Sequence, residues 1–203
     1  MYGDRRATTL MGLGARHGGR EGRRDVARHQ HTGQTGSTHQ LPAATAGQGR
    51  PGQSTAKGDV VCYYGNRGQP EPVVLTPGIY GLSNALLDTP WRKLSFGKQL
   101  FQEAVEQSQA LSKDTLIAQL LDVLNNEEAQ LPDPAIMDQG REYVQPFLSK
   151  YAAVCVRGPN YGTRTNTIIL VDVEGHVTFT ERSMLDKDPT CWETSTYEFK
   201  LQS

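Results

Sequence analysis

Polar side chains that could do chemistry occur at two places in the sequence, each next to an apolar run. Ser83 and Asn84 follow the short run 79–82, so they stand where an extended segment ends. A carboxamide in such a place can donate a hydrogen bond to a developing oxyanion. Spacing alone favours a simpler role, in which Asn84 caps its own turn. We therefore treat Ser83 and Asn84 as candidate ligand-binding residues and assign no catalytic residue.

A second group of polar residues lies in segment 158–167, whose glycine, asparagine and hydroxyl content suits a binding loop. Arg164 could hold a carboxylate or a phosphate through two parallel hydrogen bonds, and Thr163 offers a hydroxyl beside it. The alternative is a surface arginine on a hairpin. Glu181-Arg182 could either pair with Arg164 across a sheet or remain solvated. Thr163 and Arg164 are the second pair of candidate ligand-binding residues.

The residues for nucleophilic or metal chemistry are scarce. His176 is the only histidine after residue 55, so a Ser–His–Asp or Cys–His set would need a histidine from the N-terminal part. The cysteines Cys62, Cys155 and Cys191 are widely spaced and form no CxxC pair. This spacing predicts neither a zinc site nor a disulfide framework, and it favours reduced thiols. We predict no metal site.

The elements that position these residues follow from hydrophobic periodicity. We predict strands over 59–64, 72–75, 79–82, 151–156, 165–173, 176–180 and 192–201. We predict helices over 90–107, with Thr89 as cap and Pro90 at the first helical position, and over 113–125, with Ser112 as cap. Residues 129–149 contain prolines and a glycine and are interpreted as a long surface loop. The order predicts an α+β fold with helices against antiparallel sheet.

Residues 1–55, called the leader below, have a different composition. The leader carries eight arginines, no lysine and three acidic residues, a net charge of +5. Residues 56–203 carry thirteen basic and nineteen acidic residues, a net charge of −6. The leader has few large apolar side chains, so their burial cannot offset a backbone entropy cost of about 1–2 kcal/mol per residue. We predict that residues 1–55 are disordered and that residues 56–203 form the folded part.

Three other interpretations of the leader were considered. An Arg-Gly tail can bind RNA with a steep dependence on salt, but aromatic residues are almost absent here. A transit peptide would need an amphipathic apolar face, which the leader lacks. We predict no nucleic-acid partner, and we interpret the leader as out-of-frame translation in an isoform. No apolar stretch is long enough for a transmembrane segment, and no secretory signal is present.

Several blocks of residues 55–203 resemble one known family. The matching blocks are Lys57–Val60, Tyr64–Gly68, Gly81–Lys93, Asn125–Ile136, Tyr161–Val171 and Phe179–Lys187. They are similar to the C-terminal half of the Transport and Golgi organisation protein 2 homologues, which form the Asn-Arg-Asp-Glu (NRDE) family. The similarity extends over about 149 of the 203 residues.

This resemblance implies a partial αββα sandwich like that of the N-terminal-nucleophile hydrolases. The family's cysteine after the initiator methionine and its Asn-Arg-Asp-Glu signature are missing, since the chain begins Met1-Tyr2. Asn84 and Arg164 match family motif positions. The resemblance therefore implies a non-catalytic cytoplasmic factor for Golgi organisation, protein secretion and mitochondrial lipid or haem homeostasis, with mitochondrial or Golgi association. The alternative is an amide hydrolase whose nucleophile this chain lacks. A hydrophobic small molecule or haem is the implied ligand.

Overall fold

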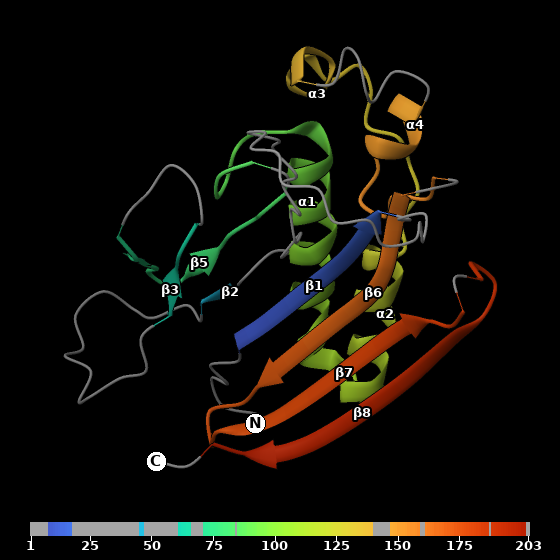
Figure 1. Cartoon of the computed structure of the whole chain (residues 1–203). Coiled ribbons are helices and arrows are strands. Elements are labelled where there is room, and N and C mark those ends of the chain that lie inside the picture. Colours follow the sequence, from blue (N-terminus) through green and yellow to red (C-terminus); the bar gives the residue numbers. More distant parts are fainter. Residues whose placement is uncertain are drawn as a thin grey trace, which may run out of the picture.

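The computed structural model describes residues 8–17, 45–46, 61–65, 71–83, 85–139, 147–158, 161–186 and 188–201 (Figure 1). Its largest element is a four-stranded antiparallel sheet with strand order β1-β6-β7-β8. These strands are β1 (Thr8–His17), β6 (Tyr161–Val171), β7 (His176–Met184) and β8 (Trp192–Lys200). Two short sheets pair β2 (Thr45–Ala46) with β5 (Gly78–Ile79), and β3 (Cys62–Tyr63) with β4 (Val73–Val74).

In the chain, the helices follow the strands of the two small sheets and precede β6, β7 and β8. They are α1 (Arg92–Gln107), α2 (Lys113–Leu124), α3 (Pro134–Gln139) and α4 (Leu148–Tyr151), with a 3-10 turn over Ser108–Ala110. The predicted α+β class is confirmed, as are the two long helices. Among the described residues, no helix has the length and apolar character needed to cross a bilayer.

The helices α1 and α2 lie on one side of the large sheet (Figure 1). Phe101 from α1, Leu120 and Leu124 from α2, and Ile168 from β6 are almost fully buried and form one core cluster. Leu170 packs against the same cluster from β6. Because burial of each such side chain stabilises the fold by about 1.5–3 kcal/mol, this cluster joins the helices to the sheet.

The helix-facing side of the sheet also carries threonines. Register aligns Ile168 with Thr180, and Thr180 with Thr196, so all three share the helix-facing side. The hydroxyls of Thr180 and Thr196 lie 3.2 Å apart and form a hydrogen bond. Strand β7 is buried on both faces at its start, since Val177, which points to the other side, is buried as are Thr178 and Thr180.

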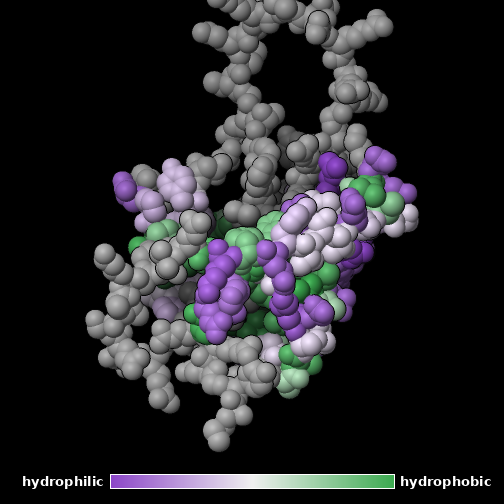
Figure 2. All heavy atoms as spheres, turned by 90° about the horizontal axis from the view of Figure 1, so that it is seen from below, coloured by the Kyte–Doolittle hydropathy of each residue, from purple (hydrophilic) through white to green (hydrophobic). Residues whose placement is uncertain are grey.

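Aromatic side chains occupy the other side of the sheet. Phe179 and Tyr197 are register partners with ring centroids 6.4 Å apart, and Phe199 is aligned with Val177. Tyr197 is 61% exposed and Phe199 is 52% exposed. Figure 2, which views the molecule from below, shows hydrophobic surface among hydrophilic side chains. The exposed aromatic row is the kind of surface that another layer of protein covers.

Strand β1 corrects the prediction for part of the leader. Thr8–His17 pairs with β6 over its whole length, from Thr8 opposite Val171 to His17 opposite Tyr161. Disorder was therefore the wrong prediction for these ten residues. Strand pairing is made by backbone groups, so the free edge of a long strand can recruit a segment with few apolar side chains. The leader is otherwise outside the described residues, apart from Thr45–Ala46, and a boundary at residue 55 stays a prediction.

The segment between α2 and β6 differs from its prediction. Residues 129–149 were predicted as loop, yet they contain α3 and the beginning of α4. Residues 151–156 were predicted as a buried strand, but the segment begins at the end of α4 and continues as turns. Ala152, Ala153 and Cys155 are nevertheless buried. A short apolar run has the same pattern in a strand and in a buried turn, so periodicity could not separate the two.

The two long helices begin in different ways. Ser112 caps α2 as predicted, since its Oγ accepts a hydrogen bond from the Thr115 N–H. Helix α1 begins two residues later than predicted, and Thr89 does not cap it. The Thr89 hydroxyl instead donates a hydrogen bond to the Leu86 carbonyl. The distant Asp133 instead accepts the hydrogen bond of the Arg92 N–H at 2.7 Å. An anionic oxygen at this end also suits the helix dipole.

Candidate functional site

The loop from Gly81 to Asp88 is closed by backbone and side-chain hydrogen bonds. The Gly81 N–H donates to Asp88 Oδ1 at 2.8 Å, and the Asp88 N–H donates to the Gly81 carbonyl at 2.7 Å. Lys98 Nζ, from α1, forms an ion pair with the same Asp88 Oδ1 at 2.8 Å. Asp88 has a φ of 55°, which is uncommon for a residue other than glycine. The loop is therefore held against α1 by a single carboxylate.

A groove runs between this loop and α1. It has a volume of about 500 Å³ and is open to solvent. Ile79, Pro90 and Leu94 supply its apolar lining, while Asp88 and Lys98 supply its charges. Three polar residues of α1 complete the lining: Ser95, Gln99 and Gln102. Three apolar and five polar residues thus make a mixed lining, in which apolar surface lies beside charged and amide groups.

Gly81 sets how closely the loop approaches the helix. A Cβ at this position would lie 2.8 Å from Cγ and Cδ2 of Leu94 and 3.0 Å from Cδ of Lys98. Gly81→Ala should therefore destabilise the protein by about 1–3 kcal/mol, since the loop must move off α1. Urea unfolding measures the change. Gly78→Ala is the matched control, because its Cβ would meet only the Tyr80 ring at 3.5 Å or more. Equal losses in both variants would contradict the close approach.

The predicted ligand-binding residues fall in separate places. Ser83 is half-buried in the loop beside the groove, and Asn84 is outside the described residues. Thr163 and Arg164 lie at the start of β6. Among the described residues, no hydrogen bond or ion pair joins Ser83 to Thr163 or Arg164. A shared role for the two pairs stays a prediction.

Thr163 has a structural contact. Its Oγ1 accepts a hydrogen bond from the Val156 N–H at 3.1 Å, and its own N–H donates to the Val156 carbonyl at 2.7 Å. These bonds fix the segment before β6 to the strand. Arg164 is half-buried, and its Nε is buried without a hydrogen-bond partner. The Nε of Arg164 is thus the one atom of this pair that is shown buried with an unused hydrogen-bonding capacity.

A buried lysine that the sequence analysis missed lies at the N-terminus of α1. Lys93 is 3% exposed, and its Nζ donates to the Tyr151 carbonyl at 2.8 Å. The ammonium lies 4.3 Å from the centroid of the Tyr151 ring and 5.4 Å from that of Trp91. Burial lowers the pKa of Lys93 to about 7, while the charge of Asp133 acts in the opposite direction. Burial also raises the pKa of Tyr151. In the sequence, the only indication that this lysine is buried is its position between the apolar residues Trp91 and Leu94.

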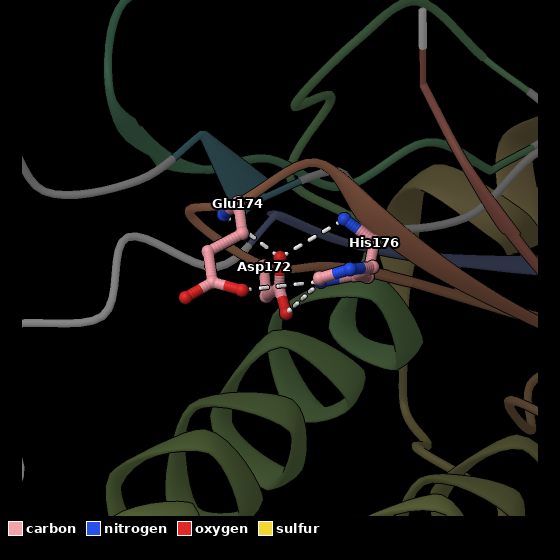
Figure 3. Close-up of side chains that lie close together, drawn as sticks. All are labelled: Asp172, Glu174 and His176. Carbon is pink, nitrogen blue, oxygen red and sulfur yellow. Dashed lines mark hydrogen bonds and ion pairs between the residues drawn. The ribbon is translucent and has the colours of Figure 1, made fainter.

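Three ionisable side chains converge at the turn between β6 and β7 (Figure 3). His176 Nδ1 lies 3.1 Å from Asp172 Oδ2 and 3.5 Å from Glu174 Oε2. Burial acts to raise the pKa of Asp172, but the N–H groups of His176 and Glu174 and the His176 ring lower it overall. The sequence analysis predicted no such cluster, although the spacing Asp-x-Glu-x-His at a tight turn could have indicated it. All three residues take part in the hydrogen bonds and ion pairs that close the turn.

Haem, the cofactor implied by the resemblance, does not fit the groove. Haem iron is held by histidine, methionine, cysteine or tyrosine, and none of these lines the groove. Of the other such residues, Cys155 is buried and His176 is at the exposed turn. We therefore derive no role for haem from this groove.

The sheet, the packed helices and the groove define an α+β protein with a candidate ligand-binding site beside α1. Residues 46–186 match the family model described as Transport and Golgi organisation 2. The chain belongs to this family.

Three relatives show how far the similarity extends. The human Transport and Golgi organization protein 2 homolog is 83% identical over 150 residues, which are 74% of this chain and 54% of the relative. The mouse homolog is 82% identical over the same shares. Transport and Golgi organization protein 2 of Drosophila melanogaster is 33% identical over 110 residues, 54% of this chain and 38% of the relative. The chain thus spans about half the length of the mammalian relatives that it matches.

Proposed function

We propose that this protein is a non-catalytic factor in Golgi organisation and protein secretion, and that it binds a small molecule with an apolar body. The groove between the Gly81–Asp88 loop and α1 carries this proposal. Its lining joins Ile79, Pro90 and Leu94 to the Asp88–Lys98 ion pair. An apolar molecule with a polar end can place its apolar body on the three apolar residues and its polar end beside the ion pair. Golgi organisation is taken from the names of the family's curated members, and protein secretion rests on the family resemblance.

The proposal has a finer part, which rests on the family resemblance alone. It includes a role in mitochondrial lipid homeostasis and an association with the Golgi or with mitochondria. It also includes a layered αββα sandwich, in which a second sheet covers the aromatic row of Phe179, Tyr197 and Phe199. The exposure of Tyr197 and Phe199 supports a further layer, because large aromatic side chains favour burial.

A fluorescent fatty acid tests the groove as the binding site. Ser95→Trp places a large ring over the groove, so we expect at least a roughly tenfold loss of affinity for cis-parinaric acid, about 1.4 kcal/mol. Gln107→Trp is the control, since Gln107 is exposed at the end of the same helix and does not line the groove. Fluorescence titration measures both. Unchanged affinity in Ser95→Trp would reject the groove.

The proposed process is tested in cells that lack the full-length homologue. Expression of this chain should restore Golgi morphology and secretion of a reporter, and Ser95→Trp should restore them less well. If neither the unchanged chain nor Ser95→Trp restores Golgi morphology or secretion, the process needs the part of the family protein that this chain does not contain. That result would reject the process for this chain, whereas the fatty-acid titration tests the groove separately.

A further inference from the structure

Two glutamines on α1 are oriented by glutamates one turn further along the helix. Gln99 Nε2 donates to Glu103 Oε1 at 2.9 Å, and Gln102 Nε2 donates to Glu106 Oε1 at 2.7 Å. An ionised carboxylate can only accept hydrogen bonds, so each glutamine must direct its NH₂ group at its glutamate. Each amide oxygen is thereby left for another partner, and no described residue supplies one.

These amide oxygens belong to the groove beside α1. Gln99 and Gln102 line it, whereas Glu103 and Glu106 do not. The NH₂ groups are thus tied to residues outside the groove, and the oxygens are the ends of the two amides that a ligand can occupy. Ser95 adds a hydroxyl to the same lining, and a hydroxyl can accept as well as donate.

Lys98 is the one cation among the described residues that line the groove, and it is already paired. Its Nζ lies 2.8 Å from Asp88 Oδ1, which also accepts the Gly81 N–H. An anionic group placed at Lys98 would come close to the Asp88 carboxylate, and like charges repel each other. Asp88 Oδ2 has no partner in the described part of the chain, so it is a further acceptor at this end of the groove.

The charges around the groove also favour a cation. Within the lining, the charges of Asp88 and Lys98 cancel. The two glutamates that hold the amides add negative charge one turn away, and they form no ion pair with a described residue. Arg92, at the exposed start of α1, is about two turns from Gln99 and does not line the groove.

We propose that the ligand of this groove carries a primary ammonium group at the end of its apolar chain, as a long-chain amine does. This inference rests on the proposed function, since it names the class of ligand for the same groove. An ammonium has three N–H donors and one positive charge, which suit unpaired oxygens in a negative surrounding. A carboxylate has only acceptors, so it would leave the amide oxygens unpaired.

Titration calorimetry of the full chain with decylamine and with decanoate tests the proposal, at constant ionic strength and below the micelle concentration of each. The two compounds have the same chain length, and at about pH 7.5 the first is a cation and the second an anion, like the side chains of lysine and glutamate. We expect decylamine to bind at least about tenfold more tightly than decanoate.

Reversing the charge of the lining should reverse this preference. Gln99→Lys removes one acceptor and adds a positive charge, so decanoate should bind it more tightly than decylamine does. Gln107→Lys is the matched control, since it adds the same charge to the same helix about 12 Å further on and outside the groove. It should keep the preference of the wild type. Gln102→Lys repeats the test at the second amide, and urea midpoints establish that each variant is folded.

The outcomes separate the ammonium from the groove itself. If Ser95→Trp weakens both compounds but decanoate binds the wild type as tightly as decylamine, the ammonium preference is overturned and the groove remains a site. If neither compound binds, or if Ser95→Trp leaves both unchanged, the groove is rejected and the preference with it. An equal reversal in Gln107→Lys, or none in Gln99→Lys and Gln102→Lys, would overturn the role of the amide oxygens.

Discussion

Replacing Lys93 with methionine is expected to remove most of the increase in stability that the protein gains between pH 7 and pH 10. Burial lowers the pKa of Lys93 from the usual 10.5 to about 7. Between these values the unfolded state holds the proton and the folded state does not, so the free energy of unfolding rises with pH. One pKa unit corresponds to about 1.4 kcal/mol, and the whole rise is about 5 kcal/mol. Below pH 7 Lys93 is protonated in both the folded and the unfolded state, so it no longer makes the free energy of unfolding depend on pH.

Urea unfolding of the wild type and of Lys93→Met at several pH values from 6 to 9.5 measures this effect. The upper limit avoids ionisation of tyrosine, because the raised pKa of the buried Tyr151 would lower stability at higher pH. Lys150→Met serves as control, since Lys150 is exposed on α4 and its loss should leave the slope unchanged. Parallel pH profiles for the wild type and Lys93→Met would show that the ammonium is not desolvated.

The parts of the fold that depend on local pattern could be predicted from the sequence. The helices over Arg92–Gln107 and Lys113–Leu124 follow from apolar residues at helical spacing, and the hairpin between β6 and β7 follows from Glu174-Gly175. Gly175 has a φ of 78°, a conformation that glycine adopts without strain. Strand β1 could not be predicted, because its partner β6 is about 150 residues away and pairing uses the backbone.

The candidate sites were harder to predict, because they depend on which residues meet across the fold. Ser83 was identified by type, but the groove beside it needs α1 next to the Gly81–Asp88 loop, a contact that no local pattern gives. Asn166 fell both in the polar segment 158–167 and in the strand predicted over 165–173, and its full burial could not be predicted, since it depends on the neighbouring strands and helices. Lys93 was overlooked for the same reason, as its surroundings come from Tyr151 and Asp133, which are distant in the sequence.

Asp133→Ala is expected to lower the free energy of unfolding by about 2–4 kcal/mol, because one buried carboxylate satisfies the ends of two helices. Asp133 is 2% exposed. Its Oδ2 accepts from the Arg92 N–H at 2.7 Å, and its Oδ1 accepts from the N–H groups of Ala135 and Ile136 at 3.0 and 3.4 Å. Alanine leaves all three donors unpaired, and all three belong to first turns, one in α1 and two in α3.

Two comparison variants separate this role from ordinary helix capping. Ser112→Ala removes an exposed cap from α2 and should cost about 1 kcal/mol. Asp133→Asn retains one acceptor oxygen and loses the charge, so its loss of stability should be smaller than that of Asp133→Ala. If Asp133→Ala costs no more than Ser112→Ala in urea unfolding, the carboxylate does not join the two helices.

The charge of Asp133 gives this variant a dependence on pH that a simple cap would not have. Asp133 raises the pKa of Lys93 against the effect of burial, so it stabilises the protonated lysine. At pH 6 Lys93 is largely protonated and loses this support in Asp133→Ala, whereas at pH 9 it is neutral and loses little. The loss of stability should therefore be greater at pH 6 than at pH 9. In the Lys93→Met background the difference should disappear, and its persistence there would show that another group is responsible.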